Sequence, residues 1–70
     1  MAFDYSKLWA ILKERDMYRE ELRISTGMSS ATLAKLGKNE IVSLEVLGRI
    51  CEVLKCDIGD IVEYKADKEI

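Results

Sequence analysis

The chain has no proline and no histidine, and glycine occurs only four times among its 70 residues. Proline and glycine interrupt helices, so their scarcity leaves the chain free to be mostly helical. The two cysteines, Cys51 and Cys56, fit neither a C-x-x-C motif nor a disulfide framework, and without histidine a structural zinc site would lack ligands. We therefore expect a helical protein with no metal or cofactor, whose cysteines are small buried residues in a reducing compartment.

Long apolar runs are also missing. No window approaches the roughly 18 apolar residues of a membrane-spanning helix, and residues 1–5 hold no basic patch ahead of an apolar segment. A chain of this size has a small core and little material for an elaborate active site. No histidine is present to activate a cysteine, and no glycine loop could cradle a phosphate. We expect a cytoplasmic protein that spans no membrane, is not an enzyme and binds no small-molecule ligand.

The apolar residues that are present recur at helical spacing. Leu47, Ile50, Cys51 and Leu54 fall at i, i+3, i+4 and i+7, which is the clearest amphipathic stripe in the chain. The pattern predicts an all-α fold in a single domain over residues 1–70. It places five short helices at about residues 5–15, 19–26, 30–36, 44–55 and 58–63, with a polar, frayed tail at 65–70. The side chains expected to cap helix starts are Asp4, Ser29, Ser43 and Asp57.

Residues 20–36 have the layout of a helix-turn-helix, in which two short helices are joined by a tight turn. Gly27 can supply the left-handed residue that ends the first helix, and Gly37 is expected to stop the second. Four apolar residues fit the positions where two crossed helices would touch, at Leu22, Met28, Leu33 and Leu36. The outward residues are small or basic, which suits a helix entering a DNA groove about 12 Å wide: Ser29, Ser30, Ala31, Thr32 and Lys35. A glycine turn between short helices is also common in all-α domains, so this segment alone leaves simple packing open.

The net charge argues against a DNA partner, but its distribution does not. The formal charge is -2 and the pI is about 5.1, whereas phosphate binding requires cations. Residues 19–38 nevertheless hold four basic and two acidic residues, and residues 29–39 hold two lysines and no acid. The acidic excess lies in residues 39–70. The second helix of the motif and its exit loop thus form a small cationic face on an acidic body.

The order of these features resembles the Cro and lambda-repressor family of helix-turn-helix regulators, also called the Xre family. The resemblance covers about residues 5–64. It is carried by Thr26-Gly27-Met28-Ser29-Ser30-Ala31-Thr32-Leu33-Ala34-Lys35-Leu36, Val42-Ser43-Leu44-Glu45-Val46-Leu47, Ile50-Cys51-Glu52-Val53-Leu54 and Asp57-Ile58-Gly59-Asp60-Ile61. It implies a lambda-repressor-like domain of five helices, in which the second and third bind double-stranded DNA. The function implied is regulation of transcription.

The resemblance also implies which residues contact DNA. It puts Ser30, Ala31 and Lys35 at base edges, where Lys35 can donate to guanine or to a phosphate. The residues beside them are Ser29, Thr32 and Lys38, and those against phosphates are Arg19, Tyr18 and Asn39. Two simpler interpretations stay open, because Ser29 can be only a helix cap and Tyr18 only a half-buried aromatic residue.

Two residues depart from the family pattern. Arg23 stands where such proteins usually carry alanine or glycine at the close approach of the two helices, and its head is expected to reach solvent or Glu20. The carboxylate of Glu20 would repel a phosphate. The acidic net charge favours one alternative function, a protein-interaction or antitoxin-like module that keeps the fold without strong DNA binding.

The short side chains of the outward face predict weak sequence discrimination by one subunit. We therefore expect a homodimer on a two-fold symmetric site, with its recognition helices about 34 Å apart. The sequence does not show the dimer face. Residues 58–63 with Tyr64 and Ile70 are one possibility, because they combine a late position with apolar side chains.

Overall fold

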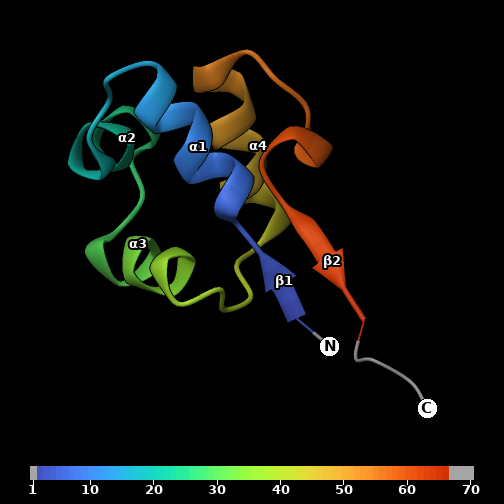
Figure 1. The fold of residues 1–70 in the computed structure, drawn as a ribbon. Coiled ribbons are helices and arrows are strands. Elements are labelled where there is room, and N and C mark those ends of the chain that lie inside the picture. Colours follow the sequence, from blue (N-terminus) through green and yellow to red (C-terminus); the bar gives the residue numbers. More distant parts are fainter. Residues whose placement is uncertain (1, 67–70) are drawn as a thin grey trace.

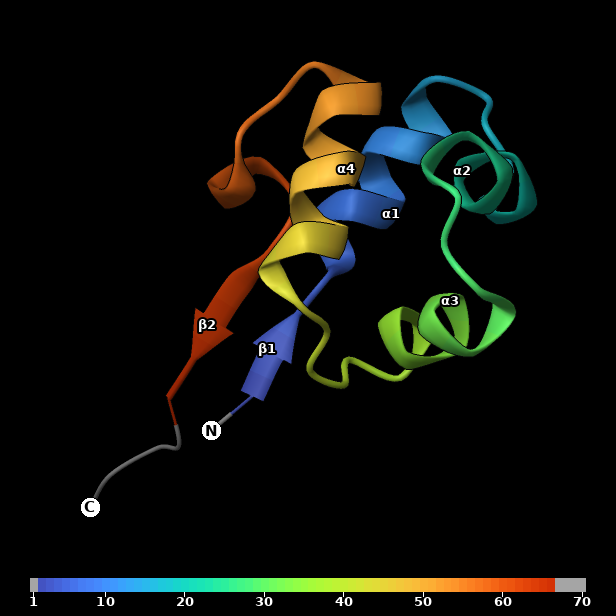
Figure 2. The ribbon, with the colours of Figure 1, turned by 180° about the vertical axis from the view of Figure 1, so that it is seen from behind.

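The computed structural model describes residues 2–66, which form four α-helices, one short 3-10 turn and two short strands (Figure 1). The elements in chain order are β1 (Ala2–Asp4), α1 (Ser6–Glu14), α2 (Arg19–Thr26), α3 (Ser30–Gly37), α4 (Leu44–Leu54), the 3-10 turn η1 (Ile58–Asp60) and β2 (Glu63–Lys65). In both ribbon views α1, α2 and α4 lie together, while α3 stands at the margin of the bundle (Figures 1 and 2). Within residues 2–66, no helix is long and apolar enough to cross a membrane.

Every α-helix contributes at least one side chain to a single core. The most completely buried side chains are Tyr5, Leu8, Leu22, Leu36, Ile50, Leu54 and Ile61. The helix-turn-helix residues expected to face inward do so, because Leu22, Met28 and Leu36 are buried and Leu33 packs against them half-buried. Both cysteines are free and pack against the core, but they are half-buried and therefore more exposed than expected.

Three of the four predicted caps are confirmed. The side chains of Ser29 and Ser43 accept hydrogen bonds from the backbone N–H groups of Thr32 (3.1 Å) and Val46 (3.2 Å), and Asp57 accepts one from Ile58 (2.8 Å). The prediction for Asp4 is one residue too early, since α1 begins at Ser6 and Tyr5 occupies the cap position. The Asp4 carboxylate still accepts the N–H of Ser6 at 2.7 Å. Hydrogen bonding by the Ser6 side chain, and next by this N–H, lowers the pKa of Asp4.

The last of the five predicted helices, at residues 58–63, is shorter than predicted. Only Ile58–Asp60 form a helical turn, and Glu63–Lys65 instead pair antiparallel with Ala2–Asp4. Phe3 stands opposite Tyr64 in this pairing, with the two ring centroids 5.2 Å apart. The partner strand lies about sixty residues earlier in the chain, so local periodicity could not reveal it. Of the predicted frayed tail, Lys65 belongs to β2, and residues 67–70 lie outside the described residues.

The turn of the helix-turn-helix is built as predicted, whereas the end of α3 is not. Gly27 has a φ of 76°, the left-handed conformation that ends α2. Gly37 is the last residue of α3, so the helix ends one residue later than predicted. The left-handed residue beyond it is Asn39, with a φ of 59°. Asparagine tolerates this conformation because its short side chain can hydrogen-bond locally.

Two glycines with opposite backbone requirements provide a test of this fold. Gly27→Ala is expected to lower the free energy of unfolding by about 1 kcal/mol, because alanine resists a positive φ. Gly48→Ala, in the middle of α4 with nothing within 4 Å of the added methyl group, is expected to raise it by about 0.5 to 1 kcal/mol. Urea unfolding of both variants measures the two changes in the free energy of unfolding. Changes of the same sign would contradict the assigned turn and helix.

Candidate nucleic-acid interface

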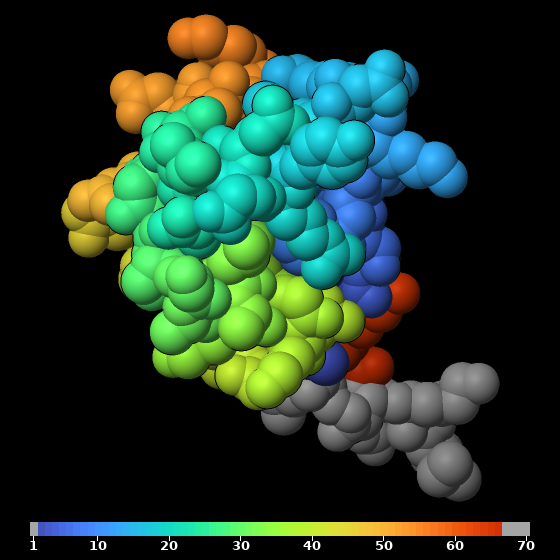
Figure 3. Space-filling model, turned by 90° about the vertical axis from the view of Figure 1, so that its left-hand side faces the viewer, coloured from blue at the N-terminus to red at the C-terminus, as the bar shows by residue number. Residues whose placement is uncertain are grey.

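The outward face of α3 consists of small and basic side chains. Ser30, Ala31, Ala34 and Lys35 are exposed, while Leu36 on the opposite side is fully buried. Seen from the side, α2 and α3 lie next to each other on one face of the molecule (Figure 3). The residues expected at base edges therefore lie at the surface on one side of α3.

The first turn of α3 presents free backbone donors beside a capped start. Ser29 is both exposed and a cap, and its hydroxyl also lies 3.0 Å from that of half-buried Thr32. The N–H groups of Ser30 and Ala31 find no acceptor within residues 2–66. Such amides, together with the helix dipole, favour an anion near the start of α3.

The basic residues near α3 are not neutralised by the chain itself. Lys35 and Lys38 are exposed and form no ion pair within residues 2–66. In contrast, Arg49 pairs with Glu45 at 3.0 Å, and Lys65 pairs with Asp4 at 3.5 Å. The charges that remain available to a polyanion thus include the two lysines at the end of α3.

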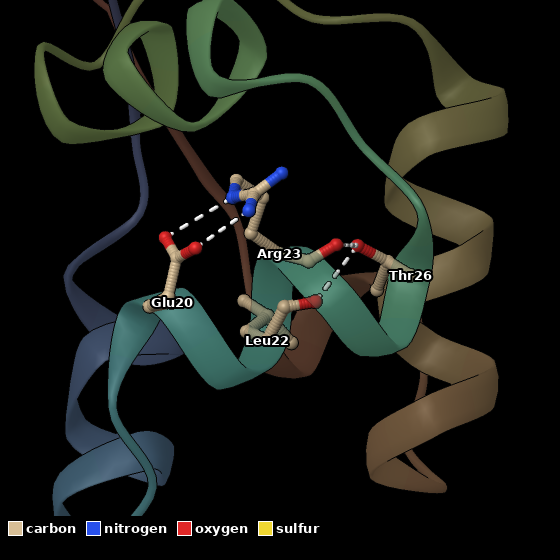
Figure 4. Close-up of polar contacts among 4 residues, drawn as sticks. All are labelled: Glu20, Leu22, Arg23 and Thr26. Carbon is tan, nitrogen blue, oxygen red and sulfur yellow. Dashed lines mark hydrogen bonds and ion pairs between the residues drawn. The ribbon is translucent and has the colours of Figure 1, made fainter.

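Arg23 and Glu20 form a bidentate ion pair within α2 (Figure 4). The guanidinium donates from Nε (3.1 Å) and Nη2 (2.5 Å) to the two carboxylate oxygens, and this contact lowers the pKa of Glu20 and raises that of Arg23. The expectation that the head of Arg23 reaches Glu20 is confirmed. Because each charge cancels the other, Glu20 is a weaker source of repulsion for a phosphate than it would be alone.

Tyr18 and Arg19 stand at the start of α2. Tyr18 is 79% exposed, so the interpretation of it as a half-buried aromatic residue is wrong. The guanidinium of Arg19 lies over the ring of Trp9, with its central carbon 3.8 Å from the ring centroid. Sequence reasoning missed this contact, because Trp9 belongs to α1 and no spacing rule joins it to Arg19.

Asn39 has a structural contact in addition to any role at a phosphate. Its Oδ1 accepts the backbone N–H of Tyr5 at 3.0 Å, and the Tyr5 hydroxyl donates to the carbonyl of Glu40 at 2.8 Å. Burial of this tyrosine raises its pKa. The two hydrogen bonds tie the exit of α3 to the start of α1, a connection that sequence reasoning also missed.

Comparisons with known proteins agree with this geometry. Residues 7–67 match the model of the Cro/C1-type HTH DNA-binding domain. The chain is 36% identical over 61 residues to the uncharacterized HTH-type transcriptional regulator YozG of Bacillus subtilis, covering 84% of this chain and 73% of that protein. It also superposes on the crystal structure of the transcriptional regulator VanUg, Form II, with a TM-score of 0.87 and 58% identity, covering 89% of this chain and 83% of the other. The exposed helix, its glycine turn and these matches together show that the chain belongs to the Cro/C1-type helix-turn-helix family of DNA-binding transcriptional regulators, which is not a class of enzymes.

Proposed function

We propose that this chain is a sequence-specific transcriptional regulator that acts in the cytoplasm and binds double-stranded DNA as a homodimer, with α3 in the major groove. The observation that carries the proposal is the outward face of α3, where slender side chains surround the unpaired Lys35. An eight-residue helix is about 12 Å long, which is close to the width of the major groove. No bulky side chain on this face would keep the helix out of the groove.

The contacts divide by chemistry. Serine hydroxyls pair with either kind of base, and an alanine methyl group can touch only a thymine methyl group, so Ser30 and Ala31 discriminate weakly. Lys35 gives the directional preference, through guanine O6 and N7. The remaining residues assigned to this interface position the protein on the backbone or lie beside the base contacts: Tyr18, Arg19, Ser29, Thr32, Lys38 and Asn39.

Salt dependence tests DNA binding and separates the two types of contact. Lys35→Ala is expected to cost about 1 to 3 kcal/mol of binding free energy through the loss of one base contact, and to relax the sequence preference at that base pair. Arg19→Ala is expected to weaken all duplexes alike and to reduce the slope of log affinity against log salt by about 1. Fluorescence anisotropy with labelled duplexes selected from a random pool measures both effects.

Lys55→Gln is the matched control for these charge changes. Lys55 follows the end of α4 that lies farther from α3 in both ribbon views, and we expect its loss to leave affinity and slope nearly unchanged (Figures 1 and 2). Equal, uniform losses from Lys35→Ala and Arg19→Ala would contradict the assigned roles. No binding at low salt would favour the protein-interaction function that the acidic net charge suggests.

The homodimer in this proposal has a candidate face beside the loop that follows α3. Ile41 and Leu44 are 73% and 76% exposed, and they line an apolar groove of about 240 Å³ with Phe3, Ile58 and Val62. Of the face suggested by the sequence, Ile61 is buried in the chain's own core, Tyr64 is half exposed, and Ile70 lies outside the described residues. None of the groove residues belongs to the proposed DNA contacts, so a second copy could occupy the groove while α3 stays free.

A charge placed in this groove tests the dimer. Leu44→Glu is expected to convert the dimer to a monomer, because pairing would bury the new carboxylate without a partner. Ile24→Glu is the matched control, since Ile24 is 66% exposed on α2 and does not line the groove. Sedimentation velocity over a range of protein concentrations shows whether each variant is a monomer or a dimer. A dimer that survives Leu44→Glu would contradict this face, and a wild-type protein that stays monomeric with and without DNA would contradict the homodimer.

A further inference from the structure

Arg19 is held between residues from two other helices. Its guanidinium lies over the Trp9 ring of α1 at 3.8 Å, and its Nη1 lies 3.4 Å from the place where a Cβ at Gly37 of α3 would stand. The stack therefore joins the start of α2 to α1 and to the last residue of α3. We name Trp9, Arg19 and Gly37 the arginine clamp.

The hydrogen-bond donors of Arg19 distinguish it from the other three arginines of the chain. Arg15 donates to the carbonyl of Leu54 at 2.7 Å, and Arg23 and Arg49 donate to glutamates on their own helices. Within residues 2–66, no acceptor takes an N–H of Arg19. Its flat face is occupied by Trp9 while its donors along the edge remain open.

This arrangement matches what a phosphate group requires. A guanidinium can give two parallel N–H donors to two phosphate oxygens, and a stacked guanidinium keeps its plane fixed before the anion arrives. Fixing the plane in advance reduces the rotamer freedom that a long side chain loses on binding. Gly37 lies beside this guanidinium, since a Cβ at Gly37 would stand in van der Waals contact with Nη1.

We propose that Trp9 is a positioning residue, which holds the Arg19 guanidinium in one plane so that its edge binds a phosphate of the DNA backbone. This inference rests on the proposed function, because the phosphate belongs to the duplex that α3 enters. Trp9 itself touches no DNA in this arrangement. Its contribution to affinity passes through Arg19 and disappears when Arg19 is absent.

A double-mutant cycle measures that dependence. Trp9→Leu is expected to weaken duplex binding about two- to fivefold, the size of an exposed cation–π contact, and Trp9→Phe is expected to restore most of the loss. In an Arg19→Ala background, Trp9→Leu should have no further effect. In a Lys35→Ala background, Trp9→Leu should have its full effect, because within residues 2–66 no ion pair or side-chain hydrogen bond joins Lys35 to Trp9 or Arg19. Circular dichroism checks that each variant is folded at the temperature of the assay.

The single tryptophan of the chain gives a second readout. Binding of a duplex is expected to change the emission of Trp9 in the wild-type protein and to leave it unchanged in Arg19→Ala at a concentration that still saturates. An equal loss from Trp9→Leu in the presence and absence of Arg19 would show that Trp9 only supports the fold, and would overturn the clamp. Unchanged wild-type emission on a bound duplex would overturn it too. If the wild-type protein binds no labelled duplex at low salt, the proposed function itself fails.

Discussion

The position of α3 depends on one buried residue, Tyr5, which fixes the end of that helix from outside it. An eight-residue helix at the margin of the bundle has only Leu36 fully buried, and this is little apolar anchorage for an element that must keep its other face free. The hydrogen bonds from Tyr5 to Asn39 and to the carbonyl of Glu40 supply the missing constraint on its exit. At the entrance, the left-handed Gly27 and the cap at Ser29 set the direction of the chain. The helix is therefore held at both ends, while its outward face stays exposed among residues 2–66.

Charge pairing reconciles an acidic chain with an anionic partner. A net charge of -2 would oppose DNA if it were spread evenly, because phosphate binding depends on cations. Arg23, Arg49 and Lys65 are paired with carboxylates, whereas Lys35 and Lys38 have no acidic partner within residues 2–66. Arg19 adds a third cation, oriented by Trp9. The cations that remain beside α3 are those that a phosphate backbone could use.

Local sequence signals predicted the helical part of the fold and not its long-range contacts. The spacing of Leu47, Ile50 and Leu54, and the capping side chains of Ser29 and Ser43, act within one or two turns, so they can be recognised directly. The strand pair of Phe3 with Tyr64 joins the two ends of the chain, and the stack of Arg19 on Trp9 joins two helices, so neither leaves a periodic signal. The same limit applies to the site. The exposure of α3 followed from the pattern of apolar residues. The structural role of Asn39, whose side chain accepts a hydrogen bond from the N–H of Tyr5, became apparent only from the folded chain.

We propose that the outward face of α3 is the surface that meets the duplex. The most direct measurement is an NMR titration of the labelled protein with a selected duplex, which follows the backbone amide of each residue. The largest chemical-shift changes are expected on the N–H groups of Ser30, Ala31 and Lys35 and on the start of α2, with small changes in residues 49–55 at the far end of α4. Large changes along α4 with α3 unaffected would contradict it.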